Sequence, residues 1–591
     1  MSEYYAPVKD MQFVLNELVG LNALCELPGF EEASPDVISA VLDEAAKLAG
    51  GVLSPLNVVG DQLGSKVVDG QVLPADGFKA AYHQFVEGGW PALGGDINYG
   101  GMGMPKMITA FHEEMLCSAD ISFSLYPGLT AGAGLSIAKH GSEELKERYL
   151  TRLYTGEWTA SMCLTEAHAG TDLGMIRTKA IPQDNGCYLI SGSKMFITAG
   201  EHDLADNILH LVLAKLPDAP EGSRGISMFL VPKFKINHDD SLGDFNQVTC
   251  GSIEHKMGIH ASATCVMNFD GAEGYLVGEV NKGLAAMFTM MNFERIGVGI
   301  QGIGAAVRSY QNAVEYAKER LQSRALSGVK SPDKPADSLM VHGDVRRMLL
   351  NMKSLTEGSR ALSAYISLQL DIATYGEGEA QSKAESLVAL MTPLAKAFFT
   401  DVAFDNTVAG QQVFGGHGYI REWGQEQLVR DCRIAQIYEG TNGIQAMDLI
   451  ARKVAASKGQ LMQVFIDEVN FYLTLDHPAQ LAEFISPLAS SITKLAELTD
   501  NIVQQSAHNP EILGTAANDY LHCFGYVAMA YTWALMAEKS IENLTQDSEF
   551  YQAKLKTARY YFTKILPRID SLILAAKVDA DVLFDLTEDE F

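Results

Sequence analysis

A carboxylate in mainly apolar surroundings lies in the segment Arg430–Gln445, which reads RDCRIAQIYEGTNGIQ. Glu439 follows an isoleucine and a tyrosine, and apolar neighbours make a carboxylate a stronger base. Asn442 stands three residues before Gln445, a spacing that predicts an N-cap for a helix beginning there. The segment therefore supplies either a general base at a helix start or an ordinary solvated loop charge.

Hydroxyl and aromatic side chains gather in two further clusters, MCLTEAHAGTDLG from Met162 and KMFITAG from Lys194. Thr165, Phe196 and Thr198 are the residue types that a flat heteroaromatic ring requires, because such a ring needs an aromatic wall and hydrogen-bond donors at its edge. Each cluster alone is also typical of a structural turn or an alternating strand.

Paired glycines mark a fourth cluster, QVFGGHGY, from Gln412 to Tyr419. Adjacent glycines let the backbone approach a phosphate group closely and expose its amide donors. The same pattern is also common where a helix ends in a turn. The loop is therefore a candidate phosphate contact only in combination with the other clusters.

The elements that must position these clusters change in character along the chain. Helical spacing of apolar residues dominates to about Tyr154, interrupted by a glycine-rich loop at Gly88–Gly103. Helical periodicity returns from Gly283, and another helical block follows Lys458. The strand-sized runs between these regions are 188–198, 208–216, 226–231 and 265–269.

This pattern predicts a mainly α protein with an inserted β domain. The expected parts are an N-terminal helical domain at 1–160, a central β domain at 161–280, a helical bundle at 281–455 and a C-terminal helical extension at 456–591. Long amphipathic helices form a bundle because they bury their apolar stripes against each other. The extension carries no phosphate loop or nucleophile motif, so we expect it to have a structural, dimer-supporting role.

Composition limits the possible partners. The formal net charge of −28 disfavours nucleic acid and anionic membranes, because both would be repelled. The eight cysteines are scattered without a C-x-x-C pair, which predicts reduced thiols rather than a disulfide framework or a metal site. The N-terminus lacks the basic start and apolar core of a signal peptide, so we expect a cytoplasmic protein without integral membrane association.

Together, and in this order, the four clusters resemble the acyl-CoA dehydrogenase family. The family's T-E-x-x-A-G-[ST]-D segment, K-x-[WF]-I-T strand, Q-x-x-G-G-x-G loop and I-Y-E-G-T element all occur here. The resemblance covers roughly residues 1–454. The chain's length and start also resemble the subgroup with a C-terminal helical extension, which includes bacterial fatty acyl-CoA dehydrogenases and 3-methylthiopropanoyl-CoA dehydrogenases.

The resemblance implies an FAD cofactor and assigns roles by motif. Glu439 resembles the base that takes the α-proton of the substrate, and its backbone amide would help to hold the thioester carbonyl. Arg320 resembles the arginine that binds the FAD pyrophosphate of the neighbouring subunit, which implies a homodimer. The full set of residues that resemble cofactor contacts is Met162, Thr165, Gly170, Thr171, Phe196, Thr198, Arg320, Gln412, Gly415, Gly416 and Thr441.

A second carboxylate competes for the role of base. Glu294 lies immediately before Arg295 in MMNFERIGVG, and a few family members carry their base at this helix position. Glu439 is the expected base, because members that use the alternative position usually lack the glutamate of the Y-E-G-T element. Asn292 and Arg295 are candidates for the CoA or pantetheine side of the cleft, and the alternative is a helix-surface salt bridge.

The chain departs from the family pattern at two other places. His168 replaces a usual small residue in the T-E motif, and we expect a polar loop side chain there. Where many members continue their arginine motif to a Phe-Gly pair that contacts FAD, this chain reads LQSR from Leu321 to Arg324.

The resemblance implies α,β-dehydrogenation of a fatty acyl-CoA, of medium to long chain, to a trans-2-enoyl-CoA in fatty acid β-oxidation. An electron-transfer flavoprotein is the expected acceptor. The alternatives are a 3-methylthiopropanoyl-CoA dehydrogenase and an acyl-CoA oxidase, which would reduce oxygen instead. The intact Glu439 and the acidic charge disfavour a catalytically weak relative that serves in assembly or in nucleic-acid binding.

Overall fold

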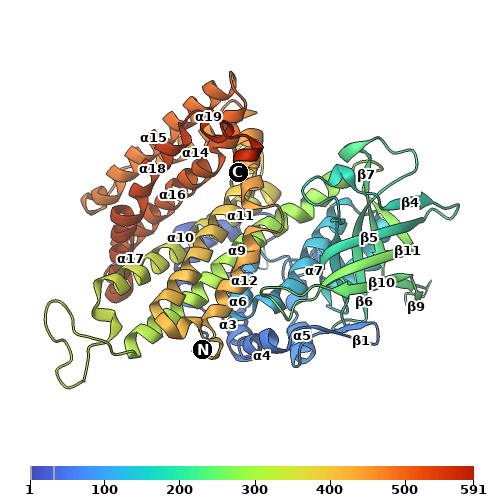
Figure 1. Ribbon diagram of the computed structural model, residues 1–591, viewed down its shortest axis with the longest axis horizontal. Coiled ribbons are helices and arrows are strands. Elements are labelled where there is room, and N and C mark those ends of the chain that lie inside the picture. The colour runs from blue at the N-terminus through green and yellow to red at the C-terminus, as the bar shows by residue number, and fades with distance from the viewer. Residues whose placement is uncertain (1–2, 31–32, 238) are drawn as a thin grey trace. The chain divides into compact units, whose positions relative to one another are not determined.

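The computed structural model describes residues 3–30, 33–237 and 239–591 (Figure 1). It divides into two compact units, of which the first comprises residues 1–43, 106–114 and 298–591 and the second comprises 44–105 and 115–297. Helix α9 (Gly283–Glu319) begins in the second unit and continues in the first. The predicted mainly α fold with an inserted β domain is confirmed.

The second unit is built around a seven-stranded sheet in the order β10-β11-β5-β4-β6-β3, with β7 pairing both β11 and β6. The long β5 and β11 run antiparallel, whereas β3 and β6 run parallel. Buried apolar side chains such as Ile190, Val212 and Phe229 form its core. The strands are β3 (Trp158–Cys163), β4 (Lys179–Pro182), β5 (Tyr188–Thr198), β6 (Asn207–Lys215), β7 (Ile226–Pro232), β10 (Val248–Ile253) and β11 (Thr264–Val277), and a separate hairpin joins β8 (Phe234–Ile236) and β9 (Leu242–Phe245).

Helices accompany the sheet in this unit, and a small hairpin lies among them. Strands β1 (Lys66–Val68) and β2 (Gln71–Leu73) form an antiparallel pair in a region expected to be mainly helical. The turn that joins them consists of Asp69 and Gly70, and both residues have a left-handed backbone. An Asp-Gly pair between short apolar runs favours such a turn, because both central residues need positive φ. The helices are α4 (Leu56–Leu63), α5 (Phe78–Glu87), the later part of α6 (Lys106–Ala119), α7 (Ile121–His140) and α8 (Glu143–Tyr154).

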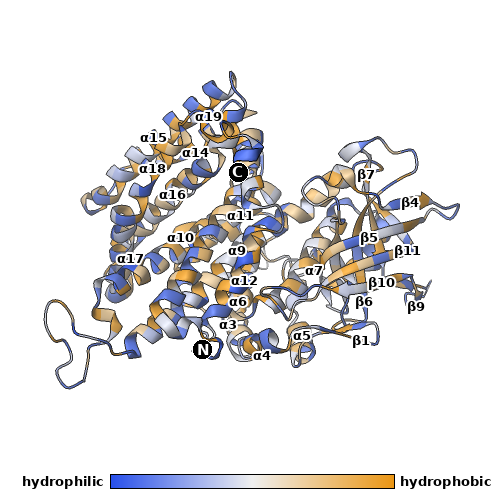
Figure 2. Ribbon diagram, viewed as in Figure 1, coloured by the Kyte–Doolittle hydropathy of each residue, from blue (hydrophilic) through white to orange (hydrophobic). Residues whose placement is uncertain are grey.

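The long elements of the first unit are all α-helices. Helices α10 and α11 pack along each other and lie side by side in Figure 1. Figure 2 shows orange apolar and blue polar residues alternating along these helices, as expected for helices with one buried face. The helices up to residue 455 are α1 (Val8–Phe13), α2 (Leu21–Cys25), α3 (Pro35–Leu48) as far as Asp43, the first part of α6, the later part of α9, α10 (Gly343–Tyr375), α11 (Gly378–Phe414), α12 (Gln425–Arg433) and α13 (Asn442–Met447).

The C-terminal extension forms the remaining helices of this unit. Helices α16 and α17 pack on α10, and the buried Trp533 donates its indole N–H to the carbonyl of Ser354 at 3.2 Å. The helices are α14 (Gln460–Leu473), α15 (Ala482–Ser506), α16 (Glu511–Glu542), α17 (Ser548–Tyr560), α18 (Ile569–Ala576) and α19 (Asp581–Phe584).

Buried charges join the extension to the start of the chain. The Lys554 ammonium of α17 pairs with Asp10 of α1 and, at 2.7 Å, with Glu357 of α10. Arg360 bridges Asp10 and Glu114, the latter at 2.6 Å. All five side chains are at most 12% exposed, so each charge depends on its partners rather than on water.

One stretch of the described chain, Gly378–Tyr419, is long and apolar enough to cross a membrane by length and composition. Its most apolar window is 78% buried within the structure, as is common for a core helix of a helical bundle.

Candidate active site

The Glu439 carboxylate is carried by a turn just before α13. Glu439 has φ 55° and Gly440 has φ 84°, so two successive residues are left-handed. A left-handed backbone costs a residue other than glycine roughly 1–2 kcal/mol, and such costs are concentrated at functional sites. The neighbours of Glu439 must therefore impose its conformation.

Those neighbours hold the turn from two sides. Gln445 is fully buried and donates its side-chain amide to the carbonyls of Glu439 at 3.1 Å and Gly440 at 3.4 Å. A Cβ atom at Gly440 would lie 2.6 Å from this amide nitrogen, so only glycine fits. The Tyr438 hydroxyl donates to the side-chain carbonyl of Gln301 on α9.

The predicted N-cap of the following helix is wrong by one residue. Thr441 has an extended ψ of 155°, and its hydroxyl accepts the Ile444 N–H at 3.4 Å, so Thr441 is the cap of α13. Asn442 is instead the first helical residue, and its side chain bonds to α11 at Lys396 and Asp401. The Gln445 side chain binds the carbonyls of the turn and does not take part in a capping box.

A bulge in β5 turns Phe196 outward. Lys194 pairs with Met267 and Ile197 with Cys265, so two residues of β5 face one residue of β11. Lys194 and Ile197 are buried, whereas Phe196 has φ 60° and is 57% exposed. An extra residue shifts the alternation of a strand, and here it presents an aromatic ring on the outer face. Thr198 is half-buried, two residues beyond the ring.

A buried ion pair ties the T-E segment to β5. The Glu166 carboxylate accepts from the backbone amides of Arg177 (2.7 Å) and Thr178 (3.0 Å), the Thr178 hydroxyl (2.6 Å) and the Lys194 ammonium (2.9 Å). Burial alone would raise the pKa of Glu166. The Lys194 charge and these hydrogen bonds outweigh burial and lower this pKa to about 2. Burial lowers the pKa of Lys194 despite its partner.

Sequence reasoning quoted Glu166 and Lys194 only as parts of motifs and gave neither residue a role. Lys194 is fully buried, and a charged residue at a buried position of a strand is the signal that could have revealed the pair. The backbone adds to the connection, since Met195 N–H donates to the Thr165 carbonyl at 2.9 Å. The two clusters are therefore brought together.

The T-E segment begins with Met162 at the end of β3 and continues as a loop around this pair. Met162 and Thr165 are half-buried, and Gly170 and Thr171 are exposed. The His168 imidazole donates to the carbonyl of Met175 at 3.0 Å, which agrees with the expected polar loop side chain.

Glu294 lies on the first part of α9, against α7. A Cβ atom at Gly132 of α7 would lie 2.4 Å from Oε1 of Glu294, so the missing side chain makes room for the carboxylate. Hydrogen bonds fix the two helices further along, from the Ser136 hydroxyl to the carbonyl of Ala286 (3.2 Å) and between His140 and Thr289 (2.7 Å). Glu294 is therefore held in a helix–helix contact.

The two candidate substrate residues on α9 differ in exposure. Arg295 is 9% exposed and donates to the side-chain carbonyl of Asn292 at 3.3 Å, while Asn292 is exposed. This contact is a hydrogen bond to a neutral amide and not the expected helix-surface salt bridge.

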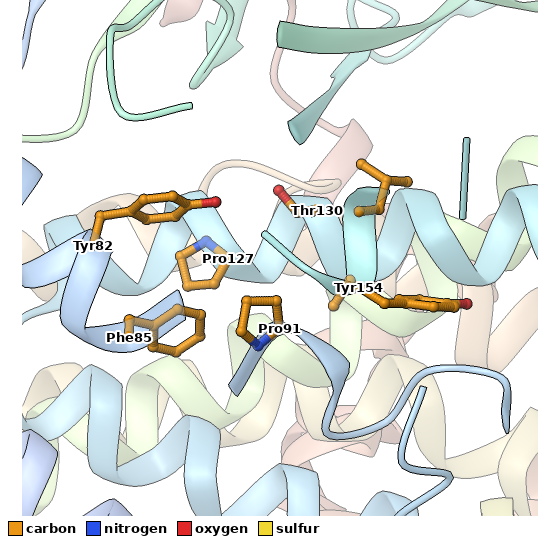
Figure 3. A pocket seen from close by; sticks show the side chains of 8 residues that line it. Tyr82, Phe85, Pro91, Pro127, Thr130 and Tyr154 are labelled. Carbon is orange, nitrogen blue, oxygen red and sulfur yellow. The ribbon is translucent and has the colours of Figure 1, made fainter. Parts of the chain in front are cut away.

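A cavity beside α7 is too small for a cofactor or an acyl group. It has a volume of about 10 Å³ and is lined by aromatic and proline side chains, including Tyr82, Phe85 and Pro127 (Figure 3). Such a space holds at most one water molecule. This face of α7 is therefore packed rather than open.

In the first unit, the paired-glycine loop ends α11. Gly415 has φ 60°, and a Cβ atom at Gly415 or Gly416 would meet no neighbour, so this backbone is open. The Tyr316 ring stacks on Phe414 at 4.1 Å, and its hydroxyl bonds the His417 imidazole at 2.9 Å. The loop is thus attached to the end of α9.

Arg320, at the end of α9, is exposed, as is Gln412 on α11. Arg324 is committed elsewhere, since it pairs with the buried Asp337 at 3.3 Å and donates to the Ser331 carbonyl at 2.9 Å. Asp401, beside the Glu439 turn, precedes Gln412 by eleven residues of α11, or roughly 17 Å. The Glu439 turn and the paired-glycine loop therefore contact α11 at points well apart along the helix.

The candidate residues divide between the two units. The second unit holds the T-E segment, β5 and the first part of α9, and the first unit holds Arg320, the paired-glycine loop and the Glu439 turn.

Comparison with known proteins covers almost the whole chain. Family models described as the acyl-CoA dehydrogenase N-terminal, middle and C-terminal domains match residues 70–157, 161–272 and 281–455. A model described as acetyl-CoA dehydrogenase C-terminal like matches residues 460–587, which is the extension.

Relatives match over the full length. The chain is 41% identical to a 3-methylmercaptopropionyl-CoA dehydrogenase of Ruegeria pomeroyi, over 95% of this chain and 96% of the relative. It is 36% identical to a butyryl-CoA dehydrogenase of Syntrophomonas wolfei, over 100% and 99%. The structure of an acyl-CoA dehydrogenase with FAD from Bacillus anthracis has the same fold, with a TM-score of 0.74 at 22% identity over 97% of this chain and 93% of that one.

A helical region, a β domain, a helical bundle and a helical extension, with a strained glutamate before α13, define a flavoprotein oxidoreductase of the acyl-CoA dehydrogenase class. The chain belongs to the acyl-CoA dehydrogenase family, whose members are FAD-dependent oxidoreductases.

The residues present fit FAD. The outward ring of Phe196 with the Thr198 hydroxyl offers the aromatic wall and the donor that the flavin ring needs. The open backbone at Gly415 and Gly416 offers amide groups without side chains in the way, as phosphate binding requires.

Proposed function

We propose that this enzyme removes a proton and a hydride from the α and β carbons of an acyl-CoA, with Glu439 as the base. The observation that carries the proposal is the left-handed, half-buried Glu439, held by Gln445 and preceded by a tyrosine fixed to α9. Backbone strain persists only where the surroundings enforce it, and a carboxylate carried on a held backbone suits proton abstraction.

In this proposal the chain's own residues prepare the proton transfer. The backbone N–H of Glu439 donates to the thioester carbonyl, which stabilises the negative charge that develops as the α-proton leaves. Glu439 then holds that proton. Phe196, Thr165 and Thr198 would hold the flavin ring. Gln412 and Gly416 would hold the phosphate and adenine side of FAD, and Arg320 would hold the pyrophosphate of the FAD in the neighbouring subunit. Bound FAD supplies the acceptor for the β-hydride.

The base assignment is tested with two matched variants. Glu439→Gln keeps the size and removes the proton acceptor, so flavin reduction by acyl-CoA should slow by at least ~10³-fold, within the range of general-base loss. Glu294→Gln should retain most of the rate. Stopped-flow absorbance of the flavin measures both. The opposite pattern would transfer the role to Glu294.

For the substrate, we propose a short acyl group, shorter than the medium to long chain expected from the sequence. Two relatives matched over the whole length are named for 3-methylmercaptopropionyl-CoA and butyryl-CoA, whereas a third, from Mycobacterium tuberculosis, is named as a broad-specificity linear acyl-CoA dehydrogenase. A 3-methylmercaptopropionyl group is as long as a pentanoyl group. Rates across a chain-length series, with the sulfur compound included, decide between these substrates.

An acyl-CoA oxidase remains the second candidate function, with oxygen in place of an electron-transfer flavoprotein as the acceptor. We propose the dehydrogenase, because the full-length relatives are named as dehydrogenases. Reduced enzyme should then reoxidise slowly in air and quickly with an electron-transfer flavoprotein. Rapid reoxidation by air alone would favour the oxidase.

We further propose a cytoplasmic homodimer that binds one FAD per chain without a covalent link. Exposed apolar side chains beside the paired-glycine loop support a contact between copies, including Tyr419 at 82% exposure, Ile420 and Trp423. The purified protein should be yellow and elute as a dimer in size-exclusion chromatography. A colourless monomer that takes up no added FAD would contradict this proposal.

A further inference from the structure

A single carboxylate on α11 binds both ends of the segment that carries Glu439. Oδ1 of Asp401 accepts the side-chain amides of Gln436 and Asn442, each at 2.7 Å. These two residues stand three positions before and three positions after Glu439. Asp401 therefore holds the two ends of the Glu439 turn at a fixed distance from each other and from α11.

The other oxygen of this carboxylate is bound by the C-terminal extension. His522 of α16 places Nε2 at 3.1 Å from Oδ2 of Asp401 and Nδ1 at 3.0 Å from the carbonyl of Asn518. Both ring nitrogens face acceptors, and only the doubly protonated imidazolium can donate to both of them. A continuous chain of contacts thus runs from α16 through α11 to the turn.

The neighbouring charges favour this ionised pair. Burial alone would lower the pKa of His522. The hydrogen bond to Asp401 and the negative charge of Asp401 outweigh this effect and raise the pKa. Burial raises the pKa of Asp401, yet the donors His522, Gln436 and Asn442 lower it overall. The other groups facing the pair are Asp519 of α16, Asp405 of α11, and Arg568 just before α18, which acts on Asp405.

We propose that His522 and Asp401 are positioning residues for the base, so that the C-terminal extension holds the Glu439 turn in its left-handed conformation. This inference rests on the proposed role of Glu439. When His522 loses its proton at alkaline pH, one of its two acceptors loses its donor, and the attraction between the imidazolium and the Asp401 carboxylate is lost. The rate of proton abstraction should then fall as the pH rises through the pKa of His522.

The chain offers a matched control for this pair. His477 also uses both ring nitrogens, with Nδ1 at 2.9 Å from Glu538 and Nε2 at 2.9 Å from the carbonyl of Tyr472. Glu538 lies on the same helix as His522 but sixteen residues further on, or roughly 24 Å away. Loss of His477 should therefore weaken the extension without reaching the turn.

The test compares His522→Gln, Asp401→Asn and His477→Gln in the full-length FAD enzyme. For the first two, amide hydrogen exchange in a peptide spanning 436–445 should become faster, and flavin reduction at saturating acyl-CoA should slow by ~10- to 100-fold with little change in KM. The alkaline decline in this rate should disappear in His522→Gln. His477→Gln should lower the Tm alone and keep the wild-type exchange, rate and pH profile.

Two results would overturn the proposal. One is unchanged exchange and an unchanged rate in both His522→Gln and Asp401→Asn. The other is an equal effect of His477→Gln on the 436–445 peptide, which would show general loosening of the extension. Failure of the base assignment looks different, because Glu439→Gln would then stay active whatever the exchange of this peptide.

Discussion

The backbone of Glu439 is held by the Gln445 side chain, and the preceding Tyr438 is bound to Gln301 of α9. The place of Glu439 in the family motif could be read from the sequence, but its left-handed backbone could not, because no local pattern marks a glutamate with positive φ. The sequence pattern also predicts Asn442 as the helix cap, whereas the cap is Thr441. Threonine and asparagine both cap helices well, and only the contacts of Asn442 with α11 show which residue does so here.

At this scale the paired variants Gly440→Ala and Gly443→Ala test how tightly the turn is held. A methyl group at Gly440 would meet Gln445 at 2.6 Å on a left-handed backbone, so unfolding free energy should fall by about 1–3 kcal/mol and flavin reduction should slow. Gly443 lies in α13 with open space around it, so Gly443→Ala should be neutral or slightly stabilising. Urea denaturation and stopped-flow absorbance measure the two effects. Equal stabilities would contradict the close approach.

At the scale of elements, strand β5 was predicted with its observed ends, whereas β11 was predicted too short. The sequence signal for β5 is clear because β-branched and aromatic residues dominate it. Prediction of β11 stopped before Gly271 and Gly274, which read as chain breakers. Gly274 is a strand residue whose Cβ atom would lie 2.9 Å from Val231 of the neighbouring strand, and a close approach of this kind leaves no local signal.

The buried pair between Glu166 and Lys194 should control the stability of the β domain. Lys194→Met leaves a buried carboxylate without its partner and should cost about 3–5 kcal/mol. Replacing both residues by methionine should recover part of that loss. The contribution of Glu166 is present above its ordinary pKa of 4.5 and is lost as the pH falls toward 2. Thermal unfolding between pH 3 and pH 7 measures this, and a double variant less stable than Lys194→Met would contradict it.

At the scale of the molecule, the order of helical and β regions followed from the sequence, but the division into compact units did not. Residues 1–43 belong with the long helices that follow the β domain, because contacts such as that between Asp10 and Lys554 join the two ends of the chain. Periodicity reports the faces of single helices and carries no information about partners that lie hundreds of residues away.

Truncation after Val454 should therefore lower thermal stability, with loss of FAD or of the dimer as a consequence. The shortened chain leaves Asp10 and Glu357 without the Lys554 ammonium. In the full-length chain, Lys554→Met should cost about 3–5 kcal/mol. Lys494→Met, at an exposed pair with Asp570, should cost less than about 1 kcal/mol. Calorimetry and size-exclusion chromatography test these outcomes, and a truncated dimer with full FAD and an unchanged Tm would refute them.

The positive φ of Glu439 also has a consequence for evolution in the laboratory. Glycine would occupy this position with less strain than any other residue, so a glycine in place of the proposed base should favour the stability of the turn. Selection for heat resistance alone would reward that replacement, and selection for turnover would remove it. At position 439, selection for stability thus favours glycine, and selection for turnover favours glutamate.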